Sequence, residues 1–478
     1  MRFPKALLAI PVAVLTACAV SLMPAITPAR AADAFGPLGP PNPFMAPNGI
    51  ASMHNDAGSA DAGPLPGPGA HLVPIFAFPL LAACPTITQG TDGLVLALCT
   101  TITAQAPVLH LIDPGGILPR VLPLASMDIA KGGLLGGVYA YLDNNNQMVL
   151  IDGTNHLLRI AHIRDERGAW QLVVTESTDL SSAITPGDSS VGVVPDYLGN
   201  VWFATANGVV GVAKIGGGVA SISLGEQVAN SISASPQNRV AVATTSALYE
   251  INLNGMGNPQ IIWSHTYDRG PARKPGQLSW GTGSTPTYFG PTGADYVTIV
   301  DNAEPQVHAL VYQSGTGALI CQQTVLTLGG PGSENSPIGV GSSMFIASTY
   351  GYPYPAVPPG AGPAVPPTAP FVGGMTRVDI DNPGPGCHTV WESKVRSAAL
   401  PHLSTGDGLI YTVTRIGFDQ TTPLDVFAYS VIDPNTGKLL HQQPKSATLL
   451  TDPIQTSSMV LMGNKIMQGS ITGIGRIG

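Results

Sequence analysis

A loose internal repeat constrains the fold of this chain more than any other feature. Units of roughly 40–60 residues run from about His71 to the end of the chain. Each unit begins with a strand pair around a small polar turn, and these openings fall at residues 94, 136, 191, 232, 286, 337, 401 and 456. A second short strand then runs into a turn rich in Asp, Asn and Gly, as in "VLHLIDPGG", "ALYEINLNG" and "FAYSVIDPNTG". Such alternation with turn residues is typical of antiparallel hairpins, two in each unit.

Four short strands per unit and eight openings predict an all-β fold, a single eight-bladed β-propeller of four-stranded antiparallel blades. The 57 Gly, the 45 Pro and a charged fraction of only 10% disfavour long helices. The eighth opening lies too close to Gly478 to form a full blade, so we expect an N-terminal strand from "HLVPIFAFPLL" (71–81) to complete the ring. Seven blades are the alternative, if one unit is a decorated loop.

The turn at Asp433 carries a resemblance to a known family. Asp433-x-x-Thr436-Gly437-Lys438, followed by an apolar pair and a bulky residue, resembles the repeat of quinoprotein (pyrroloquinoline quinone) dehydrogenase-like propellers. In that family the bulky residue is typically Trp, which docks one blade against the next. Here the position holds His441, and Cys321 in the preceding copy, while Trp263 and Trp391 follow their turns at longer distances. The resemblance implies the propeller architecture.

Cofactor ligands are not evident in the sequence. Quinone-dependent members of the family usually have an adjacent Cys-Cys pair, a catalytic Asp and acidic and amide ligands for calcium. This chain has no Cys-Cys pair, so we predict no cofactor; calcium and pyrroloquinoline quinone are the alternatives that the resemblance leaves open. The ten His residues form no H-E-x-x-H motif, and the ligands of any metal are unknown.

The first residues have the pattern of an export signal. Arg2 and Lys5 precede an apolar stretch, and Ala29-Arg30-Ala31 offers a cleavage site, which predicts a signal peptide over residues 1–31. The alternative is a lipoprotein signal, because Leu15-Thr16-Ala17-Cys18 fits a lipobox in which Cys18 carries a lipid. Both predict a secreted or cell-envelope protein, extracellular or periplasmic. The four other cysteines then predict two disulfides, with Cys84–Cys99 and Cys321–Cys387 as the nearest pairing.

The remaining chain divides by composition. Residues 32–70 are rich in Pro and Gly without periodicity, and we interpret them as a flexible leader. The propeller covers 71–478, with a Pro-rich insert at 350–370 interpreted as a surface loop. The net charge of −8 and the lack of any basic run argue against a nucleic-acid partner. We expect a monomer that contacts a membrane only through lipid on Cys18.

Polar residues concentrate in three stretches, 267–290, 298–306 and 329–339. In a propeller, the loops that enter the innermost strands surround the central channel, so side chains distant in sequence converge there. We therefore expect a ligand site at one channel mouth. Its binding residues are predicted to be Gln277, Ser284, Thr285, Asn302, Asn335 and Ser336.

Two functional classes fit these residues. The first is a binding or scaffold propeller, as in quinoprotein-like lipoproteins that assist outer-membrane assembly, with a small molecule, a carbohydrate or an envelope protein as its partner. The second is an extracellular glycan hydrolase or lyase, in which Asp301 and Glu334 act as paired carboxylates and Lys274 positions the substrate. Quinone-dependent oxidation is a third alternative.

Overall fold

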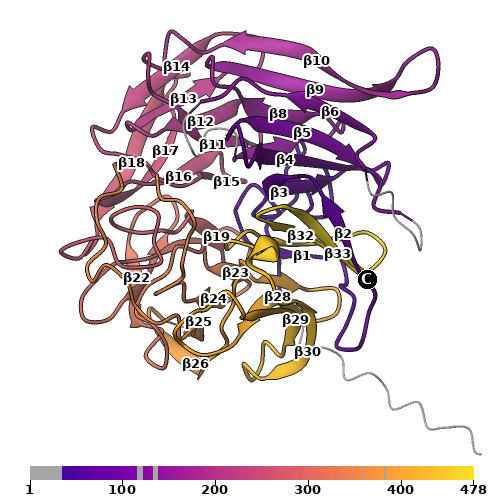
Figure 1. The fold of residues 1–478 in the computed structure, drawn as a ribbon. Coiled ribbons are helices and arrows are strands. Elements are labelled where there is room, and N and C mark those ends of the chain that lie inside the picture. Colours follow the sequence, from indigo (N-terminus) through magenta and orange to yellow (C-terminus); the bar gives the residue numbers. More distant parts are fainter. Residues whose placement is uncertain (1–34, 116–121, 133–137, 359, 382–383) are drawn as a thin grey trace, which may run out of the picture. The chain divides into compact units, whose positions relative to one another are not determined.

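The computed structural model describes residues 35–115, 122–132, 138–358, 360–381 and 384–478 (Figure 1). The expected signal peptide and Cys18 lie outside these ranges. The described residues form eight sheets that make an eight-bladed β-propeller, which confirms the predicted fold class and excludes seven blades. No helix among them is long and apolar enough to cross a membrane.

Every blade contains four antiparallel strands. Blades 1 to 4 consist of β3 (Ala82–Gln89), β4 (Val95–Thr101), β5 (Pro107–Ile112) and β6 (Ala125–Asp128); β7 (Ala140–Leu142), β8 (Met148–Ile151), β9 (His156–Arg164) and β10 (Trp170–Asp179); β11 (Ser190–Pro195), β12 (Val201–Thr205), β13 (Val209–Ala213) and β14 (Val219–Ser223); and β15 (Ser233–Ser235), β16 (Arg239–Ala243), β17 (Ala247–Leu253) and β18 (Pro259–Thr266).

Blades 5 to 8 follow the same order. They consist of β19 (Thr287–Phe289), β20 (Tyr296–Val300), β21 (His308–Gln313) and β22 (Leu319–Thr324); β23 (Ile338–Val340), β24 (Ser343–Ala347), β25 (Met375–Ile380) and β26 (Cys387–Ser393); β27 (His402–Ser404), β28 (Leu409–Ile416), β29 (Val426–Ile432) and β30 (Leu439–Ser446); and β31 (Ser458–Leu461), β32 (Lys465–Ser470), β33 (Gly473–Ile477) and β2 (Ile75–Pro79). A short 3-10 helix, η1 (Leu449–Thr451), precedes the last blade.

Burial along a blade explains the composition of its strands. In the third blade, β12 reads VWFAT and is buried at every position, because neighbouring blades cover both of its faces. The outermost strand, β14, reads VASIS and alternates between partly buried and exposed residues. Small and apolar residues therefore fill the inner strands, and polar residues collect at the rim.

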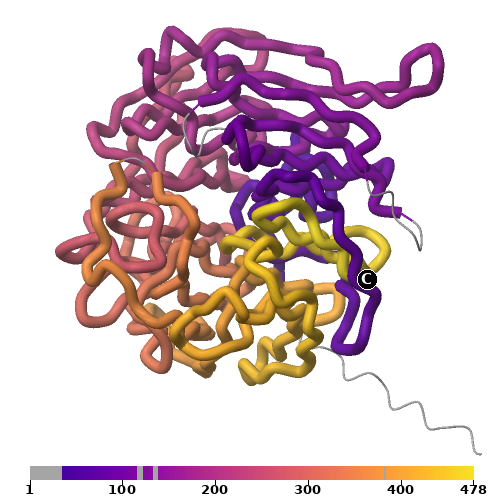
Figure 2. Tube along the Cα trace, in the orientation of Figure 1, coloured from indigo at the N-terminus to yellow at the C-terminus, as the bar shows by residue number. Residues whose placement is uncertain are grey.

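The ring is closed by pairing the two ends of the described chain. Strand β2 adds to β33 as the outermost strand of the last blade, in antiparallel register from Ile75 opposite Ile477 to Pro79 opposite Gly473. Figure 2 shows the indigo β2 segment beside the yellow C-terminal strands. The strand predicted within residues 71–81 is thus confirmed. Closure of this kind leaves the eighth blade as complete as the others.

Part of the segment expected to be a flexible leader is instead packed against the inner strands of the propeller. Residues 50–63, here called the belt, follow the inner strands of the blades. Six inner-strand N–H groups donate to belt carbonyls: Gln89 to Ile50 (3.0 Å), Leu142 to Ala51 (2.7 Å), Ala234 to Ala57 (2.7 Å), Tyr288 to Gly58 (2.8 Å), Gly339 to Ala60 (3.0 Å) and Leu403 to Asp61 (3.0 Å). The belt ends in β1 (Ala62–Gly63), which pairs in parallel with β27. The physical reason is that inner strands at a channel have one unpaired edge, and the belt satisfies it.

Both predicted disulfides are present. Cys84–Cys99 joins the two inner strands of the first blade, β3 and β4. Cys321–Cys387 joins the outermost strands of blades 5 and 6, β22 and β26. The second bond therefore links neighbouring blades at the rim.

Candidate functional site

A cavity of about 270 Å³ lies at the channel end where the inner strands begin; we call it the mouth cavity. Most of its wall comes from residues at or just before the inner strands of different blades. These are Ala83, Pro85, Val138, Tyr139, Asn230, Thr285, Glu334, Asn335, Ser336, Leu400, Ile454, Gln455 and Thr456. The belt adds Met53 and His54, and the insert adds Tyr354, Pro355, Ala356 and Pro358. Convergence of loops from many blades was the basis on which the sequence predicted a site here.

The Pro-rich insert is anchored beside this cavity. The hydroxyl of Tyr352 hydrogen-bonds to the carboxylate of Asp452, which precedes the eighth blade. Arg273 donates from Nε to the carbonyl of Gly362 (2.9 Å) and from a terminal nitrogen to the carbonyl of Gln277 (2.7 Å). The insert was expected as a surface loop; these contacts bring its residues 354–358 into the cavity wall.

Glu334 is the chemically distinctive residue of the mouth cavity. Neither carboxylate oxygen accepts a hydrogen bond of normal geometry from the described part of the chain, although both are buried. Burial raises the pKa of this carboxyl from 4.5 to about 8, against smaller opposing effects of the Leu278 backbone and the Arg273 guanidinium. Glu334 is therefore mostly neutral at pH 7 and able to donate a hydrogen bond.

Two tyrosines share the surroundings of Glu334. Burial raises the pKa of Tyr139 and of Tyr354, and the nearby Glu334 carboxylate adds to both shifts. The hydroxyl of Ser336, also in the wall, is buried and has no hydrogen-bond partner among the described residues. The mouth cavity thus combines apolar and aromatic walls with a few polar groups whose bonding capacity is unused.

Four of the nine predicted binding and catalytic residues line this cavity, and a fifth supports its wall. Thr285, Glu334, Asn335 and Ser336 line it. Ser284 lies behind the wall, where its hydroxyl donates to the carbonyl of Asn335 (3.3 Å) and accepts from the backbone of Val300 (3.2 Å). That bond holds the two neighbouring entry segments together.

Asp301 is not among the residues that line the mouth cavity. Its carboxylate accepts from the backbone N–H of His308 (2.6 Å) and is 2.8 Å from the His308 Nδ1. These bonds tie the end of β20 to the start of β21, so the carboxylate has a structural partner. The structure does not bring Asp301 and Glu334 together at one cavity, as a paired-carboxylate mechanism requires.

The other predicted residues hold loops together outside the mouth cavity. Lys274 is 1% exposed, and its ammonium donates to the carbonyls of Ala303 (2.6 Å) and Pro331 (2.8 Å). Burial lowers the pKa of Lys274, with Glu304 and Asp301 opposing the shift. The side-chain Oε1 of Gln277 accepts from the backbone N–H of Lys274 (2.9 Å), and the side-chain Nδ2 of Asn302 donates to the carbonyls at 269 and 272. Each of the three side chains thus stabilises a neighbouring turn or loop.

Metal ligands do not gather in the part of the chain that the structure describes. Within residues 35–115, 122–132, 138–358, 360–381 and 384–478, no group of three or more His, Cys, Asp or Glu side chains is arranged to hold an ion. Calcium and quinone binding remain alternatives that only the resemblance suggests.

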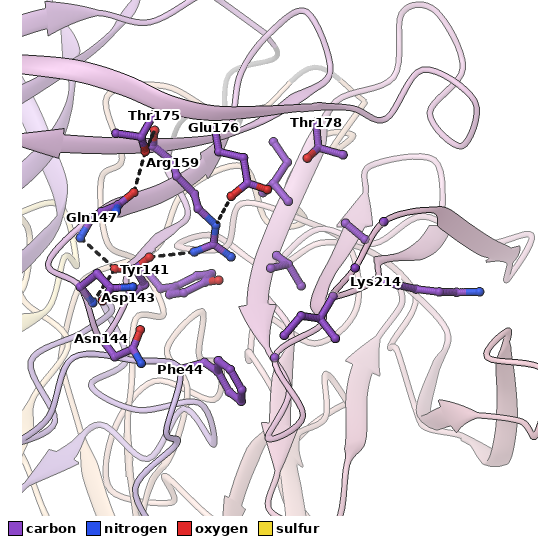
Figure 3. Close-up of a pocket in the computed structure, with 18 of the residues that line it drawn as sticks. Phe44, Tyr141, Asp143, Asn144, Gln147, Arg159, Thr175, Glu176, Thr178 and Lys214 are labelled. Atoms are coloured by element: carbon purple, nitrogen blue, oxygen red, sulfur yellow. Dashed lines mark hydrogen bonds and ion pairs between the residues drawn. The ribbon is translucent and has the colours of Figure 1, made fainter.

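A larger groove, of about 650 Å³, lies between the second and third blades (Figure 3). Its two carboxylates are already paired: Arg159 binds Asp143 (2.8 Å) and Glu176 (3.1 Å). The hydroxyl of Thr175 likewise donates to Gln147 (2.7 Å). Unlike the mouth cavity, this groove leaves no carboxylate without a partner, so volume alone does not make it the better site.

Several cavity residues were missed by the sequence analysis. Tyr139 precedes β7 in the same way that Thr285 precedes β19, so the position relative to the inner strand was a signal that could have found it. His54 and Tyr354 offered no such signal, because they arrive from the leader and from the insert.

Comparison with known proteins adds information on the fold. No protein-family model matches the chain. An uncharacterized protein of Archaeoglobus fulgidus is 29% identical over 136 residues, which cover 27% of this chain and 26% of that protein. The chain thus matches about a quarter of the length of this curated relative.

Solved structures that resemble the chain include β-propellers of different function. Sqt1 of Saccharomyces cerevisiae superimposes with a TM-score of 0.50 and 10% identity, covering 86% of this chain and 98% of Sqt1. Virginiamycin B lyase of Staphylococcus aureus gives a TM-score of 0.40 and 10% identity, covering 85% of this chain and 99% of the lyase. At such identity the likeness concerns the propeller fold, and the function has to be argued from the site.

Proposed function

We propose that this protein is an exported binding propeller that holds a small molecule in the mouth cavity. One observation carries the proposal: Glu334 presents two buried carboxylate oxygens, neither with a hydrogen bond of normal geometry from the described residues, to a cavity lined by seven blades, the belt and the insert. A buried polar group without a partner destabilises a fold by about 1–3 kcal/mol, so its presence at a cavity wall indicates a ligand-binding role.

The cavity chemistry defines the ligand class. Met53, Leu278, Leu400 and Ile454 provide an apolar surface, and Tyr139 and Tyr354 provide aromatic rings. A neutral Glu334 donates one hydrogen bond and accepts another. The best fit is a small, uncharged molecule with an apolar or aromatic body and a polar end such as an amide.

Export is the second part of the proposal. Its support is the pair of disulfides, which persist in oxidising compartments, together with the signal pattern of residues 1–31. A paired-carboxylate hydrolase is less favoured, because Asp301 is hydrogen-bonded to His308 and does not line the mouth cavity.

The test uses benzamide as a neutral probe and benzylamine as a cationic one, with binding measured by ligand-observed NMR at pH 7. We expect benzamide to bind more tightly than benzylamine, because a neutral carboxyl cannot pair with an ammonium group. Above pH 8 the order should reverse as Glu334 ionises.

Two variants make the test specific. Glu334→Leu should abolish benzamide binding, whereas Asp433→Asn, in a turn of the seventh blade that does not line the cavity, should leave it unchanged. Equal binding by the wild type and Glu334→Leu would refute the mouth cavity as the site. An N-terminus beginning before residue 31 and without lipid, in protein recovered from the producing cells, would refute export by either signal.

A further inference from the structure

The mouth cavity contains a second polar arrangement, made by the belt and the fifth blade. The Oγ1 of Thr285 lies 3.2 Å from Nε2 of His54. On the other side of the imidazole, Nδ1 lies 3.1 and 3.3 Å from the two carboxylate oxygens of Asp61. All three side chains are buried, with exposed fractions of 2%, 6% and 0%.

The order of these contacts sets the proton positions. An ionised Asp61 only accepts hydrogen bonds, so Nδ1 of His54 carries the ring proton and Nε2 is left as an acceptor. The Thr285 hydroxyl then donates to Nε2. His54 is the only hydrogen-bond partner of the Asp61 carboxylate among the described residues. Burial raises the pKa of Asp61, and the imidazole of His54 opposes that shift.

We propose that Thr285, His54 and Asp61 form a hydroxyl–imidazole–carboxylate relay that hydrolyses a small carboxylic ester in the mouth cavity. This inference rests on the proposed binding function of the same cavity. Its basis is geometric: Thr285 and His54 both line the cavity, and Asp61 orients the ring from behind. Neither the belt histidine nor the aspartate was predicted from the sequence as a functional residue.

The reaction balances with water as the second substrate. Thr285 Oγ1 attacks the ester carbonyl and its proton passes to Nε2 of His54. The tetrahedral adduct breaks its bond to the leaving oxygen, which takes the proton from Nε2 and departs as an alcohol. Water then attacks the threonyl ester, gives a proton to Nε2, and the acid leaves as the proton returns to Oγ1.

Glu334 lines the same cavity as Thr285. Its neighbour Asn335 is hydrogen-bonded to Ser284, the residue before Thr285, so the two wall segments are adjacent. A neutral carboxyl that donates to a developing oxyanion stabilises the tetrahedral adduct. The substrate class is accordingly a small ester with an apolar acyl group that fits about 270 Å³.

The experiment uses p-nitrophenyl acetate with the full-length protein. We expect a burst of p-nitrophenol, an acetyl group on the peptide that contains Thr285, and a loss of at least about 100-fold in turnover for Thr285→Val and for His54→Gln. Thr285→Ser should retain the burst, because it keeps the hydroxyl.

Asp61→Asn should lower kcat with little change in KM, as expected for a positioning residue. Thr292→Val, in an exposed turn of the same blade, should retain full turnover.

Unfolding temperatures of all variants are measured in parallel, and only variants that stay folded are compared. Absence of a burst and of acetylated Thr285 in the wild type would overturn the relay. So would equal turnover by the wild type and the folded Thr285→Val variant. If the relay fails by either result, benzamide binding that depends on Glu334 but not on Thr285 would still support the proposed binding function.

Discussion

The indole of Trp391 in the sixth blade donates a 2.8 Å hydrogen bond to the carbonyl of Pro434 in the seventh. Pro434 belongs to the turn that ends in Gly437, where a Cβ atom would lie 2.4 Å from the same indole. Trp263 of the fourth blade meets Gly317 of the fifth in the same way, at 2.7 Å. The recurring turn therefore serves as a docking surface for the tryptophan of the preceding blade.

Replacing the turn glycine tests this docking. Gly437 has φ +67°, so Gly437→Ala combines backbone strain with the overlap against Trp391, and we expect a loss of about 2 kcal/mol in the free energy of unfolding. Gly216→Ala is the matched control, because Gly216 has φ +83° with open space around it. Urea denaturation should show the smaller loss for the control. Equal losses would mean that docking contributes nothing.

A buried carboxylate joins the fourth and fifth blades. Glu250 accepts hydrogen bonds from Trp263 (2.7 Å), Tyr288 (3.0 Å), Ser314 (2.6 Å) and the backbone of Gly315 (2.6 Å). Glu250→Leu leaves these donors buried without a partner, and we expect a destabilisation of about 3 kcal/mol or more.

The control for Glu250 is Glu166→Leu, in an exposed turn, which should change the urea midpoint little. A Glu250→Leu variant as stable as the wild type would show that the four donors find other partners.

The stability of the protein should fall in acid partly because of His402. Burial lowers the pKa of this imidazole to about 3, and its Nδ1 contacts the Oδ1 of Asn55 in the belt at 3.1 Å. In the unfolded chain His402 takes up a proton near pH 6.5, whereas in the folded chain it stays neutral until the pH approaches 3. The stability that comes from the neutral, buried His402 is therefore complete above pH 6.5 and is lost as the pH falls toward 3.

His402→Gln removes the titrating group, and its free energy of unfolding should decline less steeply between pH 6.5 and 4 than that of the wild type. Parallel slopes for the wild type and the variant, measured by urea titrations across this range, would contradict the assignment.

The two disulfides should differ in their access to reductants. Cys84 and Cys99 are both 0% exposed, whereas Cys321 is 9% exposed and its bond lies on the outer strands. We expect dithiothreitol to reduce Cys321–Cys387 first under native conditions. Alkylation of the new thiols followed by peptide mass spectrometry reads out the order, and simultaneous reduction would point to global unfolding as the common route.

The sequence predicted those parts of the structure that repeat or that lie next to the repeat. The eight openings predicted the eight blades, because each opening is a local pattern of one strand pair. The short segment after the eighth opening predicted β2, because that segment holds too few residues for the four strands of a blade. Thr285 and Glu334 were found for the same reason, since both precede inner strands. Asp301 was misplaced at the ligand site because its His308 partner lies across a hairpin that sequence alone does not orient.

The leader and the insert could not be predicted in this way. Residues 50–63 lack any periodicity of their own, because their order comes from hydrogen bonds offered by strands distant in the sequence. The insert likewise depends on a contact between Tyr352 and Asp452 across two blades. The composition of such a segment predicts its conformation in isolation. Both segments become ordered because the propeller supplies hydrogen-bond partners for them.

The belt also limits when the propeller can complete its folding. Its carbonyl at Asp61 pairs with Leu403, and β2 pairs with β33 at the far end of the chain. During synthesis Asp61 and the residues of β2 therefore lack these hydrogen-bond partners until nearly all of the chain has been made. The mouth cavity has Ile454, Gln455 and Thr456 in its wall, so it cannot form before the segment that leads into the eighth blade has been synthesised.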